Sequence, residues 1–113
     1  MVSVAVAKGK PIMPLISESR QFGLCQIGEG DKIAHRKFSQ PESADDPFLG
    51  FELIPSKLPR VPILASSLAY LECELTCHMD VEGDHDLFVG RIHGAGCRDG
   101  HPKVHLREDG FSY

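Results

Sequence analysis

The feature that most constrains the fold is a strict two-residue alternation between residues 69 and 79. One set of side chains is mostly apolar, namely Ala69, Leu71, Cys73, Leu75, Cys77 and Met79. The intervening set is polar or aromatic, namely Tyr70, Glu72, Glu74, Thr76 and His78. A period of two is typical of a β-strand with one buried face. We therefore predict a half-buried strand here, with the first set facing the core.

The next segment predicts a partner for this strand. Residues 81–84 read Val-Glu-Gly-Asp, which favours a turn. The run from His85 to His93 then carries Leu87, Phe88, Val89 and Ile92 and has charge only at its ends. Two strands joined by a short turn pair with each other, so the sequence predicts a long antiparallel hairpin over residues 69–93.

Shorter elements are predicted before the hairpin. Met1 to Ala7 is a Val/Ala run that indicates a buried strand, and the residues Lys8 to Pro11 indicate a tight loop. A helical turn is expected over Ile16 to Arg20, capped by Ser17 or Ser19, followed by an apolar run at residues 22–27. Asp31 is a candidate N-cap for a short helix over Lys32 to Phe38.

Five prolines between residues 39 and 62 predict a stretch that is mostly loop, and a last strand is expected at residues 103–106. With 113 residues and 12.4 kDa, the chain has the size of one domain, residues 1–113. Many short strands and one or two short helices predict a mainly β protein, an antiparallel barrel or sandwich.

Composition excludes several classes of function. The formal net charge is −4 and the pI is about 5.8, which disfavours nucleic-acid binding. No apolar run approaches the roughly 18 residues of a membrane span, and the start lacks a signal-peptide pattern, so we expect a cytoplasmic protein. The four cysteines form no Cys-x-x-Cys pair, which argues against a zinc knuckle or a thioredoxin-type site.

Several segments, taken in order, resemble the flavin reductase family, whose fold is the FMN-binding split barrel. They are Ile16-x-x-Ser19-x-x-Phe22-Gly23-Leu24, Ile33-Ala34-x-x-x-Phe38, Pro62-Ile63-Leu64, Ala69-Tyr70-Leu71-Glu72-Cys73, Gly83-Asp84-His85-Asp86-Leu87-Phe88-Val89-Gly90 and Gly100-His101-Pro102. The most specific part is Leu-Glu-Cys followed by Gly-Asp-His-x-Leu-Phe-Val-Gly. The resemblance implies an antiparallel split β-barrel.

The chain also departs from the family pattern. Family members usually carry a strand and a Ser/Thr-rich segment ahead of the strand that corresponds to residues 2–7, and this segment supplies part of the flavin site. The usual Val-Asn after the Phe of the second strand is replaced by Gly23-Leu24-Cys25. We therefore expect an N-terminally truncated or degenerate member of the family.

The resemblance implies two regions that bind flavin and one that meets the nicotinamide. The loop along the flavin would consist of Ala7, Lys8, Gly9, Lys10 and Pro11. The phosphate would be bound near Arg36, Lys37 and Phe38, where an Arg can bind phosphate oxygens with two parallel hydrogen bonds. His85 would border the nicotinamide pocket. The alternatives are a solvated turn at residues 8–10 and a solvated charged run at residues 35–37.

The activity implied by the resemblance is reduction of FMN, or of FAD, by NADH or NADPH as transient substrate. Such a protein is expected to be a homodimer and can serve as the reductase component for a partner monooxygenase. Two alternatives remain: an FMN-binding protein without significant turnover, and a flavin-free structural or interaction protein with the same fold. No catalytic side chain is assigned, because hydride transfer depends on positioning of the cofactors.

Other chemistries find little support in the sequence. A metal site built from Asp84, His85, Asp86 and His93 would be a poor chelate, because adjacent residues of a strand point to opposite faces. We therefore expect no metal. Gly-x-Ser-x-Gly and Gly-x-Gly-x-x-Gly do not occur, which argues against an α/β-hydrolase elbow and a Rossmann dinucleotide site.

Overall fold

The computed structural model describes residues 1–38, 48, 50–59 and 61–101. Its elements are β1 (Val2–Ala7), α1 (Ile12–Ser19), β2 (Gln21–Gln26), α2 (Lys32–Phe38), β3 (Leu53–Ile54), β4 (Ile63–Leu64), β5 (Ala69–Asp80) and β6 (His85–Cys97). The predicted strand at residues 103–106 and much of the proline-rich stretch lie outside the described residues. The described part is mainly β with two short helices, which confirms the predicted class.

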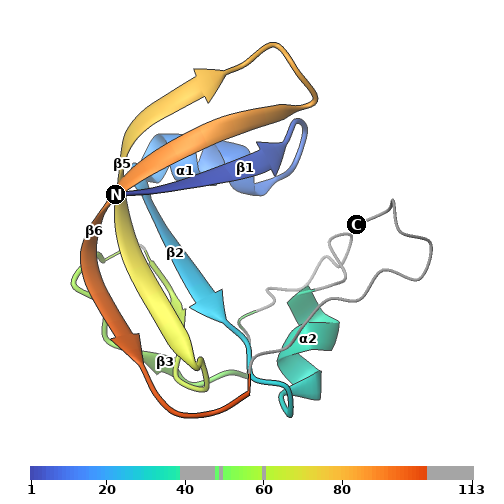
Figure 1. Ribbon diagram of the computed structural model, residues 1–113, viewed down its shortest axis with the longest axis vertical. Coiled ribbons are helices and arrows are strands. Elements are labelled where there is room, and N and C mark those ends of the chain that lie inside the picture. The colour runs from blue at the N-terminus through green and yellow to red at the C-terminus, as the bar shows by residue number, and fades with distance from the viewer. Residues whose placement is uncertain (39–47, 49, 60, 102–113) are drawn as a thin grey trace.

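The β5–β6 hairpin forms the centre of a four-stranded sheet with the order β1-β6-β5-β2, in which every neighbouring pair is antiparallel. β1 pairs with the first part of β6, near the hairpin turn, whereas β2 pairs with the first part of β5, at the other end. The sheet curls into half of a barrel (Figure 1). β3 and β4 form a separate two-stranded sheet.

A β-bulge at Thr76 corrects the predicted facing of β5. Leu75 pairs with Gly90, but Cys77 already pairs with Val89, so Thr76 has no partner in the ladder. The Thr76 hydroxyl instead donates a hydrogen bond to the Val89 carbonyl (3.0 Å). An extra residue reverses the facing of every residue after it. The prediction that Cys77 and Met79 face the core is therefore wrong, since both are exposed.

Two apolar clusters lie on opposite faces of the sheet. The first lies between α1 and the sheet and consists of Ile16, Phe22, Cys73, Leu75 and Phe88. The second joins the sheet to β4 and consists of Leu58, Val61 and Ile63, with Cys25 and Tyr70 packed against it. The sheet thus has both faces covered over part of its length, and its strands are mutually fixed there.

The first helix begins earlier than predicted. It starts at Ile12 after Pro11, which makes no side-chain capping hydrogen bond. It ends at Ser19, and the next residue, Arg20, has a left-handed φ of 60°. Pro14 is tolerated because the first turn of a helix has N–H groups without helical partners. Ser19 is not an N-cap, since its hydroxyl donates to the Gln21 carbonyl (3.1 Å) at the other end.

The second helix is confirmed over Lys32–Phe38, and its predicted N-cap is confirmed as well. The Asp31 carboxylate accepts a hydrogen bond from the backbone N–H of Ala34 (3.1 Å). The same carboxylate accepts one from the Ser66 hydroxyl (2.9 Å), which ties the start of α2 to the loop after β4. Among the described residues, neither helix has the length and apolar character needed to cross a membrane.

Candidate functional site

The structure brings together two of the three regions predicted to bind cofactors. Ala7, the last residue of β1, pairs with His85, the first residue of β6. The next residue continues this contact, since the backbone N–H of Lys8 donates to the Asp84 carbonyl (2.9 Å). Gly9 follows with φ of 85°, and the space where its Cβ would stand is open for 4 Å. The loop therefore presents accessible backbone next to His85.

The two lysines of this loop have different environments. Lys8 Nζ lies 2.8 Å from Asp80 Oδ1 and 3.8 Å from Asp86 Oδ1. The hydrogen bond that Lys8 donates to Asp80 raises the pKa of Lys8 and lowers the pKa of Asp80. Lys8 is thus bound by carboxylates of its own chain. Lys10 is exposed and makes no ion pair with the described residues, so its charge is available to a ligand.

His85 is half exposed beside this loop. Its Nδ1 lies 2.9 Å from Asp84 Oδ1, and that hydrogen bond holds the pKa of Asp84 below its ordinary value. Asp86 points to the other face of the strand, as the alternation of a strand requires. Within the described ranges, no group of three or more His, Cys, Asp or Glu side chains is arranged to hold a metal ion.

A part-buried pair beside this loop, formed by the exposed His78 and the buried Asp86, was missed by the sequence analysis. Asp86 is largely buried, and its Oδ2 lies 2.8 Å from Nε2 of His78. The His78 ring stacks on Phe88, with ring centroids 4.3 Å apart and planes 14° apart. The alternation predicts His78 on the solvent face, but the bulge at Thr76 places it on the same face as Phe88. The Thr at the bulge offered no recognisable signal.

The third predicted region, on α2, lies apart from the other two. Figure 1 shows α2 at the opposite end of the molecule from the β5–β6 turn. Arg36 is exposed, Lys37 Nζ lies 5.3 Å from the centroid of the Phe51 ring, and Phe38 packs edge-on against Phe48 with centroids 4.9 Å apart. The structure does not bring these residues to Gly9 or His85.

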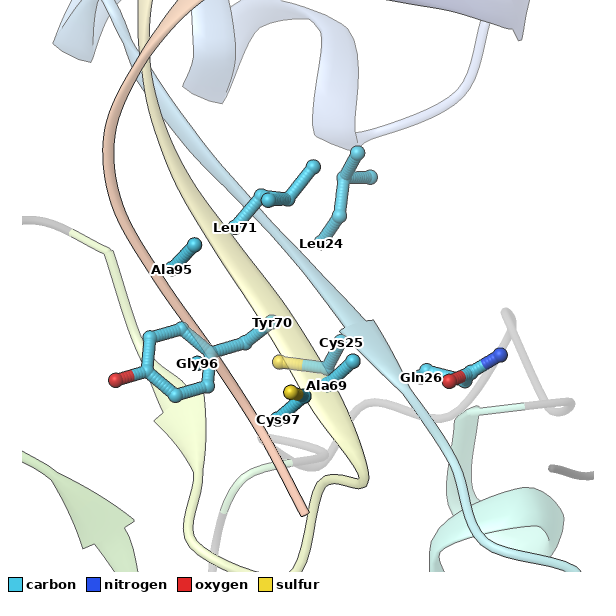
Figure 2. A pocket seen from close by; sticks show the side chains of 9 residues that line it. All are labelled: Leu24, Cys25, Gln26, Ala69, Tyr70, Leu71, Ala95, Gly96 and Cys97. Atoms are coloured by element: carbon cyan, nitrogen blue, oxygen red, sulfur yellow. The ribbon is translucent and has the colours of Figure 1, made fainter. Parts of the chain in front are cut away.

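A shallow apolar depression of about 700 Å³ lies on the sheet at the base of the hairpin, and the sequence analysis did not find it. Two rows of paired residues form its floor, Leu24–Leu71–Ala95 and Gln26–Ala69–Cys97. Figure 2 shows Leu24 and Leu71 extending from neighbouring strands, while the Tyr70 ring lies over Gly96. The small side chains of Ala69, Ala95 and Cys97 in the floor leave room for a flat apolar group.

The fold agrees with the comparisons to known proteins. Residues 1–110 match the flavin reductase like domain. The chain therefore belongs to the flavin reductase-like domain family, and its curled antiparallel sheet is the half-barrel of that family.

Three similar proteins contain a region that matches this chain. A protein of Nostoc sp. named diflavin flavoprotein A 1 is 34% identical, over 99% of this chain and 20% of its own length. The NADH-dependent flavin reductase StyB of Pseudomonas fluorescens is 28% identical, over 84% of this chain and 52% of StyB. The styrene monooxygenase flavin reductase SMOB of Pseudomonas putida S12 has a TM-score of 0.72 and 26% identity, covering 88% of this chain and 61% of SMOB. The chain thus spans about a fifth to three fifths of these relatives.

Proposed function

We propose that this chain is a flavin reductase domain that uses NADH or NADPH to reduce FMN. The observation that carries the proposal is that the loop at residues 7–11 lies beside His85. The region predicted to contact the flavin is thus next to the region predicted to contact the nicotinamide. The similarity to an NADH-dependent flavin reductase supports the choice of reaction. FAD is the alternative flavin, since binding that depends on the ring would accept both.

The residues present at this loop suit a flavin. The open space around Gly9 and its positive φ leave backbone groups accessible to a planar ring, and Lys10 supplies a free positive charge. The flavin, when bound, supplies the hydride chemistry. The chain would contribute orientation: backbone groups of Ala7 to Pro11 along the ring and His85 beside the nicotinamide.

We further propose that the protein acts as a homodimer in the cytoplasm and passes reduced flavin to a partner monooxygenase. Several large apolar side chains are exposed on the described surface, and a second copy would cover some of them; they are Ile12, Leu15, Ile33, Met79, Val81 and Ile92. Four cysteines in the thiol form suit a reducing compartment. The names of StyB and SMOB support a reductase component.

The test is a flavin titration followed by a nicotinamide oxidation assay on the purified chain. We expect quenching of FMN fluorescence on binding, and oxidation of NADH or NADPH that depends on added FMN. His85→Ala should raise the KM for the nicotinamide while the Kd for FMN changes little, because its contact is with the transient substrate. Binding without oxidation would leave an FMN-binding protein, and no binding would leave a flavin-free protein of this fold. Light scattering that gives a 12.4 kDa particle would overturn the dimer.

A second candidate is a flavin-binding module that works inside a larger flavoprotein. It is favoured by the match to the Nostoc protein, which covers almost the whole of this chain. The two candidates differ in flavin exchange, because a domain that supplies a separate monooxygenase must release its flavin. Flavin that stays with the protein through desalting supports the module, and flavin that is lost supports the separate reductase.

A further inference from the structure

We propose that His78 and Asp86 are positioning residues that hold the loop at residues 8–11 against the flavin. This inference rests on the proposed function, because it assigns to that loop the contact with the flavin ring. Asp86 contacts the loop at Lys8, and His78 contacts Asp86. Both act through Lys8, by a series of contacts that begins in the core of the sheet.

The series begins at Phe88, which is fully buried in the first apolar cluster. The His78 ring stacks on it at 4.3 Å, so the imidazole packs against a fully buried side chain. His78 pairs with Phe88 across the hairpin, and the bulge at Thr76 is what places it on this face. The orientation of the ring is therefore set by the core and by the sheet register.

The second contact joins His78 to Asp86. A carboxylate can only accept hydrogen bonds, so Nε2 of His78 donates to Oδ2 of Asp86 across 2.8 Å. The Asp86 side chain is only 9% exposed, and its other oxygen, Oδ1, is buried without a hydrogen-bond partner in the described structure. Lys8 Nζ is the cation nearest to that oxygen, at 3.8 Å. A buried carboxylate with one unused oxygen strongly favours a cation at this distance.

The third contact passes from the Lys8 side chain to the loop. Lys8 Nζ lies between Asp86 and Asp80, and its backbone N–H donates to the Asp84 carbonyl (2.9 Å). The residues that follow are Gly9, which allows many backbone conformations, and Lys10, whose N–H donates to the Ala7 carbonyl at a long 3.3 Å. Fixing Lys8 at both its side chain and its backbone therefore sets where Gly9 and Lys10 lie.

The experiment measures flavin affinity in variants that each change one contact of this series. Asp86→Asn removes the charge and keeps the shape. His78→Phe keeps a ring on Phe88 and removes the donor, whereas His78→Gln keeps a donor and removes the ring. His93→Phe is the matched control, because His93 forms a similar contact with Glu74 (3.2 Å) on an exposed part of the sheet. Kd values for FMN and riboflavin are measured on the complete chain, below the melting temperature of each variant.

We expect Asp86→Asn and His78→Phe to raise the Kd for FMN and for riboflavin alike by roughly tenfold, the effect of losing one hydrogen bond to a charged group. His78→Gln should stay near the wild-type affinity, and His93→Phe should equal it. A merely structural role would lower the melting temperature of Asp86→Asn and leave the Kd of the folded protein unchanged, which would overturn the inference alone. A wild-type chain that binds neither flavin would overturn the proposed function together with it.

Discussion

At the turn of the β5–β6 hairpin, side chains are held by ion pairs, whereas at its base they are held by close packing over glycine. We call residues 76–80 and 85–89 the tip half, and residues 69–75 and 90–97 the base half. In the tip half, Lys8 binds Asp80, and His78 binds Asp86. In the base half, the Phe22 ring covers Gly90, the Glu72 carboxylate covers Gly94 and the Tyr70 ring covers Gly96.

The two halves therefore respond to different changes. Ion pairs at a surface are weakened by salt and extremes of pH, and they yield to small displacements. Side chains packed over glycine tolerate charge screening but leave no room for added volume. We infer that the base half fixes the sheet by packing and that the tip half holds the loop at residues 8–11 by charge.

The largest expected effect tests whether the distant helix α2 serves the same flavin as the tip loop. Arg36→Ala should weaken FMN binding by about 1.5 to 3 kcal/mol if its guanidinium binds the phosphate, since hydrogen bonds between charged groups have this strength. Riboflavin lacks the phosphate, so its Kd should stay unchanged. Parallel titrations of the variant with both ligands measure this. Equal losses for the two ligands would show that Arg36 acts through folding.

A change of similar or smaller size is expected from volume added to the base half. In Gly90→Ala, the new Cβ would stand 2.7 Å from the Phe22 ring and 3.1 Å from Cys73 Cβ, both in the core. Overpacking of this kind costs about 1 to 3 kcal/mol of unfolding free energy. Gly83→Ala is the matched control, because its Cβ meets nothing within 4 Å. Chemical denaturation of both variants gives the difference, and equal stabilities would refute tight packing at the base.

Sequence patterns predicted most of the scaffold because the patterns are local. The hairpin, the strand at residues 2–7, the helix at 32–38 and its cap at Asp31 each follow from neighbouring residues. What failed depends on register, which is set between strands. One unpaired residue, Thr76, reverses the facing of His78 and thereby allows its contact with Asp86.

The site was predicted in part for the same reason. The contact between residues 7–11 and His85 follows from the pairing of two predicted strands, although the sequence alone did not state their register. The depression at the base half joins three segments, residues 24–26, 69–71 and 95–97, that are far apart in the chain. Its floor depends on which small side chains share a face, and no local pattern contains that information.

A smaller effect is expected in the tip half from Lys8→Met. The pKa of Asp80 is lowered chiefly by its hydrogen bond from Lys8, so the stabilisation exists above the ordinary carboxyl pKa and is lost as pH falls through the lowered value. Removing Lys8 should return the Asp80 titration toward its ordinary range. Carboxyl chemical shifts of Asp80, followed by NMR against pH in both proteins, measure this. Gly90→Ala should leave the titration of Asp80 unaltered, and an unshifted Asp80 in Lys8→Met would contradict the pairing.

Labelling the cysteines is expected to change stability least. The labelling rates nevertheless test whether the facing of β5 changes at Thr76, where the tip half begins. Cys73 is fully buried, and burial raises the pKa of its thiol, so it should resist iodoacetamide in the folded protein. Cys77 would share that protection if the alternation continued unbroken. Because Thr76 is bulged, Cys77 is exposed and should react at a rate comparable to that of the exposed Cys97. Mass spectrometry follows the labels, with Cys77→Ser and Cys97→Ser to assign them. Protection of Cys77 equal to that of Cys73 would contradict the bulge at Thr76. It would also contradict the placement of His78 on the same face as Phe88.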